Sequence, residues 1–172
     1  MNNIVLVGFM GTGKSVVGKL LAQKLSRPFL DLDRKIEKET GRTIRQIFTE
    51  QGEQAFRALE AKAVWETAAL KGHVIATGGG VMCDEKNVKA LKTAGVLVCL
   101  TASADVILER TSTTLNARPL LAGGDPKERV QELLRLRAPY YAQADLTIDT
   151  VGRTLQDIVE EISCRIEKPT SR

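Results

Sequence analysis

Residues 8–15 read GFMGTGKS and fit the pattern G-x-x-x-x-G-K-[ST], which binds phosphate groups when it joins a strand to a helix. An apolar run at residues 4–7 precedes it and a helical pattern follows. Its glycines let consecutive backbone N–H groups turn inward around an anion, and the helix adds its positive end. Lys14 would contact the β and γ phosphates, and the Ser15 hydroxyl is placed to ligate a bridging Mg²⁺. The sequence therefore predicts that the chain binds a nucleoside triphosphate.

A pair of carboxylates closes the second apolar run, where residues 29–33 read FLDLD. A spacing of two in an extended chain places Asp31 and Asp33 on the same side, at the strand end where ligands of α/β proteins collect. One carboxylate would hold Mg²⁺ through water, and the other would accept a proton or hydrogen bond from an acceptor hydroxyl. The alternative is that Asp33 only caps a helix that begins near Arg34.

Two arginines lie at the borders of predicted helix faces. Arg57, on a helix expected from about residue 52 to 71, has Glu60 three residues further on. This pair is either a solvated surface contact or a binding arginine oriented by a carboxylate behind it. Arg137 falls on an inward helix face and needs an anionic partner, because an unpaired buried charge is unfavourable. That face is expected to comprise Val130, Leu133, Leu134 and Tyr141.

Two further segments predict loops at the same site. Residues 77–80 read TGGG after the third apolar run, so the backbone of Gly79 and Gly80 would approach a ligand without an intervening side chain. Residues 111–124 are polar and aperiodic, which favours a mobile lid beside the phosphate-binding turn. Arg118, within this lid, would swing onto the triphosphate.

The elements that must position these residues alternate along the chain. Helical patterns separate five short apolar runs, which predicts a five-stranded parallel sheet flanked by helices on both faces. Helix starts are expected at Thr43, Asp125 and Thr154, and a helix end at Gly41. The apolar runs are residues 4–7, 29–32, 74–76, 96–100 and 146–148.

Composition narrows the class of protein. The chain has 172 residues, 43% of them hydrophobic, and a net charge of +4, which suits an anionic ligand but is too dispersed for nucleic acid. Its three cysteines are odd in number and have no C-x-x-C spacing, which argues against a disulfide framework or metal cluster. No stretch reaches the ~18 apolar residues of a membrane span. We expect a cytoplasmic, monomeric, single-domain protein over residues 1–172 with a frayed tail at residues 167–172, and no nucleic-acid or membrane partner.

Some triphosphate-binding classes are disfavoured. No N-K-x-D tetrapeptide is present to read guanine, and we interpret the D-x-x-G match at residues 149–152 as chance. Neither the third nor the fourth apolar run ends in the adjacent acidic residues of motor-type ATPases. A small phosphotransferase remains, which must align an acceptor and exclude water.

Six motifs in this order, spread over nearly the whole chain, closely resemble shikimate kinase. They are the phosphate-binding turn, DLD at residues 31–33, FRALE at 56–60, TGGG at 77–80, RPLL at 118–121 and RAPYY at 137–141. The resemblance implies a three-layer P-loop kinase fold with a mobile lid, and ATP-dependent phosphorylation of the 3-hydroxyl of shikimate. The chain departs from the family pattern in having Val16 where Thr is usual.

The resemblance also implies roles for individual residues. Catalysis would involve Asp33, Lys14 and Arg118; Mg²⁺ would be held by Ser15 and, through water, by Asp31. The nucleotide would contact Gly11, Thr12, Gly13, Lys14, Ser15, Val16, Arg110, Arg118 and Arg153. Shikimate would contact Asp33, Arg57, Gly79, Gly80 and Arg137, within a binding segment at about residues 33–60, and Glu60 would orient Arg57.

Two alternatives stay open from the sequence. One is another small-metabolite kinase of the same architecture, such as a nucleoside monophosphate or gluconate kinase. The other is a catalytically silent nucleotide-binding regulator. The retention of Lys14, Asp31, Asp33 and Arg118 counts against a regulator, because nucleotide binding alone does not require residues for an acceptor.

Overall fold

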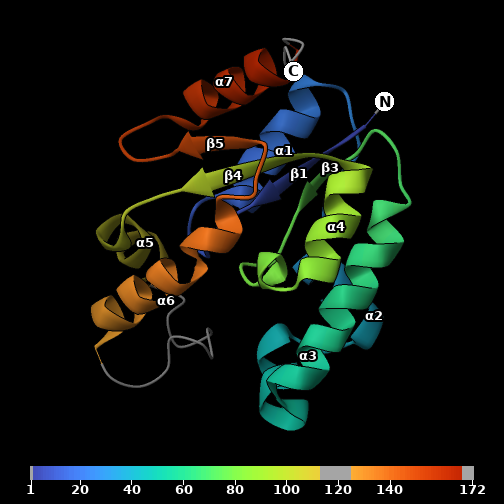
Figure 1. Cartoon of the computed structure of the whole chain (residues 1–172), viewed down its shortest axis with the longest axis vertical. Coiled ribbons are helices and arrows are strands. Elements are labelled where there is room, and N and C mark those ends of the chain that lie inside the picture. The colour runs from blue at the N-terminus through green and yellow to red at the C-terminus, as the bar shows by residue number, and fades with distance from the viewer. Residues whose placement is uncertain (1, 113–124, 168–172) are drawn as a thin grey trace.

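The computed structural model describes residues 2–112 and 125–167. One or two helices follow each strand along this part of the chain, with a short 3₁₀ turn after the third strand (Figure 1). In order, the elements are β1 (Asn3–Val7), α1 (Lys14–Lys24), β2 (Phe29–Asp31), α2 (Leu32–Thr40), α3 (Ile44–Ala68), β3 (Val74–Ala76), η1 (Val81–Cys83), α4 (Glu85–Ala94), β4 (Gly95–Thr101), α5 (Ala104–Thr111), α6 (Pro126–Tyr141), β5 (Leu146–Asp149) and α7 (Leu155–Glu167).

The five strands form one parallel sheet in the order β2-β3-β1-β4-β5. β1 lies at its centre and pairs with β3 on one side and β4 on the other, with Val5 opposite Ile75 and Leu97. The predicted five-stranded parallel sheet is confirmed. Because all strands run the same way, their carboxyl ends meet at one edge, which is where the segments after β1, β2 and β3 come together.

Helices cover both faces of this sheet, as predicted (Figure 1). Alternate residues of β1 point to opposite faces. Ile4 and Leu6 pack in a core with α1 and α7, whereas Val5 and Val7 pack in a second core with α2, α3, α4, α5 and α6. The central strand is therefore buried on both sides, which explains its uninterrupted apolar sequence.

Local signals in the sequence set several helix boundaries. Thr43 and Gln46 form a reciprocal capping box at the start of α3, and Asp125 accepts a hydrogen bond from the Lys127 N–H at the start of α6. Gly41 ends α2 in the left-handed region, with φ of 65°. These predicted boundaries are confirmed.

Two local expectations were wrong, at Asp33 and at Thr111. β2 ends at Asp31, so Asp33 lies in the first turn of α2 rather than in the strand; Asp31 itself caps that helix and thereby stops the strand. α3 is kinked at Gly52, whose φ of 83° and ψ of 171° are non-helical, so the helix expected from about residue 52 is the second segment of α3 and the one expected after Thr43 is the first. Thr111, expected in the lid, ends α5, where its hydroxyl donates to the Ile107 carbonyl. Residues 113–124 lie outside the described part of the chain.

Candidate active site

The phosphate-binding turn connects β1 to α1 at the carboxyl edge of the sheet. Gly8 has a φ of 131°, and a Cβ built there would lie 2.3 Å from the Leu100 carbonyl oxygen, so only glycine fits. The Lys14 ammonium donates to the carbonyls of Gly8 and Phe9, at 2.8 and 2.7 Å. The Thr12 hydroxyl donates to the Phe9 carbonyl at 2.7 Å. These bonds fix the Lys14 and Thr12 side chains against the backbone of the turn.

Oxygen atoms suited to a divalent cation lie beside this turn. The Ser15 hydroxyl donates to Asp31 Oδ2 at 2.5 Å, and Asp31 Oδ1 accepts from the backbone N–H of Asp33 and Arg34. Hydroxyl and carboxylate oxygens are ligands that Mg²⁺ accepts, usually together with water and substrate phosphates. Within residues 2–112 and 125–167, no group of three or more His, Cys, Asp and Glu side chains could hold a metal by itself. The pair therefore fits an ion that phosphate groups help to bind.

A cleft of about 570 Å³ opens above the turn. It unites most of the residues that the sequence predicted to bind nucleotide or metal with two from the acceptor side, Asp33 and Gly79. Its lining includes Gly11, Thr12, Gly13, Lys14, Ser15, Val16, Asp31, Asp33, Thr77, Gly79, Arg110 and Arg153. Arg57, Gly80, Glu60 and Arg137 are absent from this lining and form a neighbouring group.

In that group, Arg57 is held by carboxylates on its own helix. Its Nη1 donates to Glu60 Oε2 at 2.7 Å, and its Nε and Nη2 donate to Glu53 Oε1 at 3.3 and 3.0 Å. Glu60 is 1% exposed, and burial raises the pKa of its carboxyl, although the Arg57 guanidinium opposes the shift. The pair is therefore not the solvated surface contact that was the alternative interpretation.

Gly80 packs directly against this guanidinium. A Cβ at Gly80 would lie 2.4 Å from Arg57 Nη1, and a Cβ at Gly78 would lie 2.6 Å from Glu60 Oε1. The glycine segment, residues 78–80, thus permits the close approach of the Arg57–Glu60 pair. Its predicted approach to a ligand stays a prediction.

Arg137 reaches the other side of the glycine segment from α6. It is 7% exposed, its Nη1 donates to the Gly79 carbonyl at 3.2 Å, and its Cζ lies 5.5 Å from the centre of the Phe9 ring. Val130, Leu133 and Tyr141 are buried on the same helix, as the pattern predicted. Among the residues that the structure describes, no carboxylate forms an ion pair with this guanidinium within 4.0 Å, although Glu60 interacts with it electrostatically and Tyr141 lies beside it. The guanidinium is therefore placed to pair with an anionic ligand.

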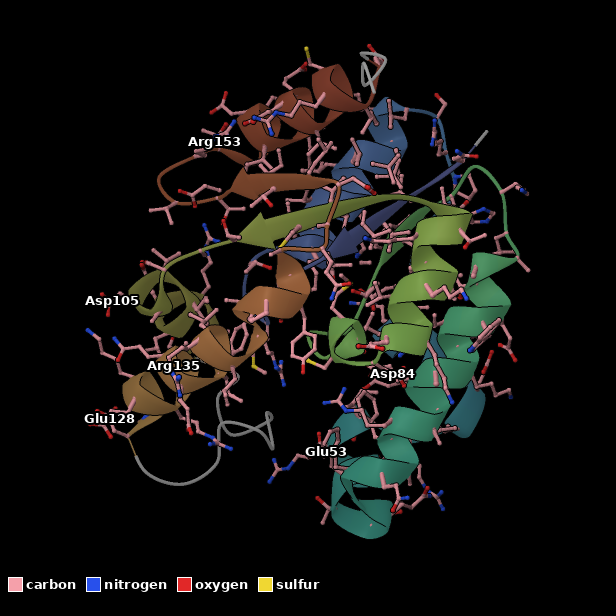
Figure 2. The ribbon with its side chains drawn as sticks, viewed as in Figure 1. Glu53, Asp84, Asp105, Glu128, Arg135 and Arg153 are labelled. Atoms are coloured by element: carbon pink, nitrogen blue, oxygen red, sulfur yellow. The ribbon has the colours of Figure 1, made fainter. Side chains whose placement is uncertain are left out.

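Two arginines line the cleft beside β5 and α7. Arg110 donates to the hydroxyl and carbonyl of Thr150, at 2.8 and 3.0 Å. Arg153, in the turn before α7, pairs with Glu161 and donates to the Asp157 carbonyl at 3.2 Å. Figure 2 shows Arg153 beside α7 and Glu53 on α3, at opposite ends of the molecule. Arg110 and Arg153 line the cleft, whereas Arg57 does not.

Thr150 lines the cleft but was missed from the sequence. It lies within residues 149–152, whose D-x-x-G match was interpreted as chance. Its position directly after β5, at the carboxyl edge of a parallel sheet, was the available signal. Tyr141 was predicted only as an inward-facing residue, yet its hydroxyl donates to the Gly79 carbonyl at 2.6 Å. Arg118 and most of the predicted lid lie outside the described residues.

The phosphate-binding turn follows the central strand of this sheet, and an acidic pair and two buried or half-buried arginines lie beside it. This combination defines a P-loop kinase of small molecules. A family model described as shikimate kinase matches residues 10–167. The chain belongs to the shikimate kinase family, which confirms the resemblance predicted from its motifs.

Named relatives agree over nearly the full length. The shikimate kinase of Thermodesulfovibrio yellowstonii is 49% identical over 168 residues, which are 98% of this chain and 96% of the relative. The shikimate kinase of Symbiobacterium thermophilum is 45% identical over 172 residues, with 99% of both chains covered.

Solved structures support the same fold. The shikimate kinase from Acinetobacter baumannii in complex with shikimate has a TM-score of 0.94 and 38% identity, covering 100% of this chain and 96% of the other. A gluconokinase from Sinorhizobium meliloti has a TM-score of 0.65 at 22% identity, which shows a common fold alone.

Proposed function

We propose that this chain is a shikimate kinase that transfers the γ-phosphoryl group of ATP to the 3-hydroxyl of shikimate, giving shikimate 3-phosphate and ADP on the route to chorismate and aromatic amino acids. One observation carries the proposal: the phosphate-binding turn and the guanidinium of Arg137 meet at Gly79. A Cβ there would lie 3.2 Å from the Met10 backbone nitrogen and 3.6 Å from Arg137 Nη1. Family membership and the shikimate bound to a relative support it.

On the acceptor side, Arg57 and Arg137 would bind the carboxylate of shikimate. Guanidinium groups match a carboxylate with two parallel hydrogen bonds, and Glu60 fixes the orientation of Arg57. Asp33 would bind the ring hydroxyls, and the backbone of Gly79 and Gly80 would line the ring's other side. The segment at about residues 33–60 would thus contribute Asp33 and Arg57 to the shikimate site, together with Glu60, which orients Arg57.

On the donor side, the residues of the turn from Gly11 to Val16 would surround the phosphates of ATP. Lys14 would transfer its ammonium hydrogen bonds from the loop carbonyls to phosphate oxygens. Arg110 and Arg153 would lie beside the adenosine. Ser15 and, through water, Asp31 would hold one Mg²⁺, which supplies positive charge to the phosphates when bound. Arg118 would add charge from the lid at about residues 111–124, a role that stays a prediction.

The residues of this chain then define the reaction. Asp33 accepts a hydrogen bond, and finally the proton, from the 3-hydroxyl of shikimate, whose oxygen forms a bond to the γ-phosphorus. The bond between that phosphorus and the oxygen bridging the β and γ phosphates breaks, and ADP leaves. Lys14 stays on the developing charge of the phosphates, while the two arginines keep the acceptor in line.

The remaining expectations concern location and assembly. Across the residues described, none of the helices has the length and apolar character to cross a membrane. We propose a single-domain monomer that acts in the cytoplasm without a nucleic-acid partner. Light scattering of the purified chain with and without ligands tests the monomer, and cell fractionation tests the location.

A side-by-side assay of acceptors tests the function. ADP release is measured with ATP and Mg²⁺ in the presence of shikimate, gluconate or nucleoside monophosphates. We expect ADP release with shikimate and not with gluconate or the nucleoside monophosphates. Turnover with gluconate or a monophosphate instead would identify another kinase of this architecture, and nucleotide binding without turnover on any acceptor would favour the regulator.

A further inference from the structure

Two side chains of α6 converge on one carbonyl of the glycine segment. The Tyr141 hydroxyl donates to the Gly79 carbonyl at 2.6 Å, and Arg137 Nη1 donates to the same oxygen at 3.2 Å. The two residues are four apart, so they leave one face of the helix, one turn after the other. Tyr141 is 8% exposed, and burial raises the pKa of its phenol, so the hydroxyl keeps its proton and remains a donor.

The carbonyls of the neighbouring Gly78 and Gly80 accept hydrogen bonds from the backbone N–H groups of Val81 and Cys83, whereas that of Gly79 accepts them from the side chains of α6. Gly79 lies among three consecutive glycines, which have the greatest backbone freedom of any residue. It is also the point at which the phosphate turn and α6 approach each other, as its closeness to Met10 and Arg137 shows. A shift of this peptide would change the spacing between the two halves of the site.

Arg137 has two uses for the same guanidinium. It donates to the Gly79 carbonyl in this structure, and in the proposed function it binds the carboxylate of shikimate. If binding draws the guanidinium toward the substrate, the carbonyl loses a donor in a buried setting, which is unfavourable unless another donor remains. The Tyr141 hydroxyl is that second donor.

We propose that Tyr141 is a positioning residue for the phosphorylation of shikimate. Its hydroxyl holds the Gly79 carbonyl, which keeps Gly79 in place in the cleft and leaves Arg137 able to bind the substrate carboxylate. The inference rests on the proposed function and adds a residue that touches neither substrate nor nucleotide.

Tyr141→Phe tests this, because it removes the hydroxyl and keeps the ring. The matched control is Tyr140→Phe, on the same helix: within the described ranges the Tyr140 hydroxyl has no hydrogen-bond partner. Loss of one hydrogen bond to a shared acceptor predicts a rise of about tenfold in KM for shikimate. KM for ATP should stay within about twofold, and kcat should fall less than KM rises. Tyr140→Phe should match the wild type.

Thermal unfolding of each variant, followed by circular dichroism, separates positioning from folding. A merely structural role would lower the melting temperature of Tyr141→Phe and leave the KM for shikimate unchanged below the transition, and that result overturns the inference. An equal rise in KM for both variants, or for both substrates, overturns it as well. Wild-type turnover in the same assay keeps the two hypotheses distinct: an active wild type with an unaltered Tyr141→Phe variant refutes the positioning role and leaves the proposed function standing.

Discussion

Gly80→Ala should weaken shikimate binding through Arg57. The added Cβ would lie 2.4 Å from Nη1, 2.7 Å from Nη2 and 2.8 Å from Cζ of that guanidinium. Since non-bonded heavy atoms normally approach to about 3.5 Å, the guanidinium must retreat by roughly 1 Å. The backbone of Gly80, with φ of −101° and ψ of −5°, is open to alanine, so the protein itself should stay folded.

The size of the effect follows from what the retreat disturbs. It should lengthen the 2.7 Å hydrogen bond to Glu60 and shift the guanidinium from the position in which we propose that it binds the substrate carboxylate. Hydrogen bonds to charged groups contribute about 1.5–3 kcal/mol, so the KM for shikimate should rise about 10- to 100-fold. The KM for ATP should stay within about twofold, since Arg57 does not line the nucleotide cleft.

A double-mutant cycle with Arg57→Ala makes the test specific. If the alanine acts by displacing the guanidinium, Gly80→Ala should change KM by less than about twofold in the Arg57→Ala background. Steady-state kinetics and calorimetric titration of shikimate supply both values. An unaltered KM in the single variant, or the same loss with and without Arg57, would refute the reasoning.

Three further substitutions probe the rest of the site. Arg137→Lys should lower shikimate affinity by about 10- to 100-fold and leave ATP binding unchanged in calorimetry, because lysine lacks the planar fork; equal affinity would contradict the clamp. Asp33→Asn should reduce kcat by about 100-fold or more while Mg·ATP still binds; wild-type turnover would remove Asp33 from the mechanism. Burial raises the pKa of Glu60 above its ordinary value of 4.5, so the native state binds more protons than the unfolded state while this carboxyl titrates. The free energy of unfolding should therefore fall as pH rises above about 4.5. Urea unfolding from about pH 4.5 to 7 should therefore show the wild type losing stability relative to Glu60→Gln, and parallel pH profiles would oppose this.

Much of the sheet edge was predictable because its signals are local. The glycines and Lys14 of the phosphate turn are adjacent in sequence, and β1 is recognisable from four consecutive apolar residues. Parallel strands then bring the segments after β1, β2 and β3 to one edge without any further information. This is why Asp31 and Gly79 were expected at one edge of the sheet, where both line the same cleft.

The errors and omissions come from competition between local rules and from distant contacts. The FLDLD segment is typical of a strand throughout, but Asp31 caps α2 and Asp33 lies in the first turn of that helix. The two carboxylates therefore share a cleft for a reason other than their spacing in a strand. Tyr141 and Gly79 are 62 residues apart, and Arg110 and Thr150 are 40 apart. No local pattern predicts such pairs, since tertiary packing alone creates them.

In the phosphate-binding turn, two backbone carbonyls accept the hydrogen bonds of the ammonium group that we expect to bind phosphate. The ammonium group of Lys14 satisfies the carbonyls of Gly8 and Phe9, so an incoming nucleotide exchanges contacts instead of adding them. The heat released on nucleotide binding would then understate the strength of the ammonium–phosphate contact. Replacing Lys14 to obtain an inactive enzyme would also remove its hydrogen bonds to the carbonyls of Gly8 and Phe9. Lost nucleotide affinity in such a variant would therefore reflect an altered loop as well as a missing charge.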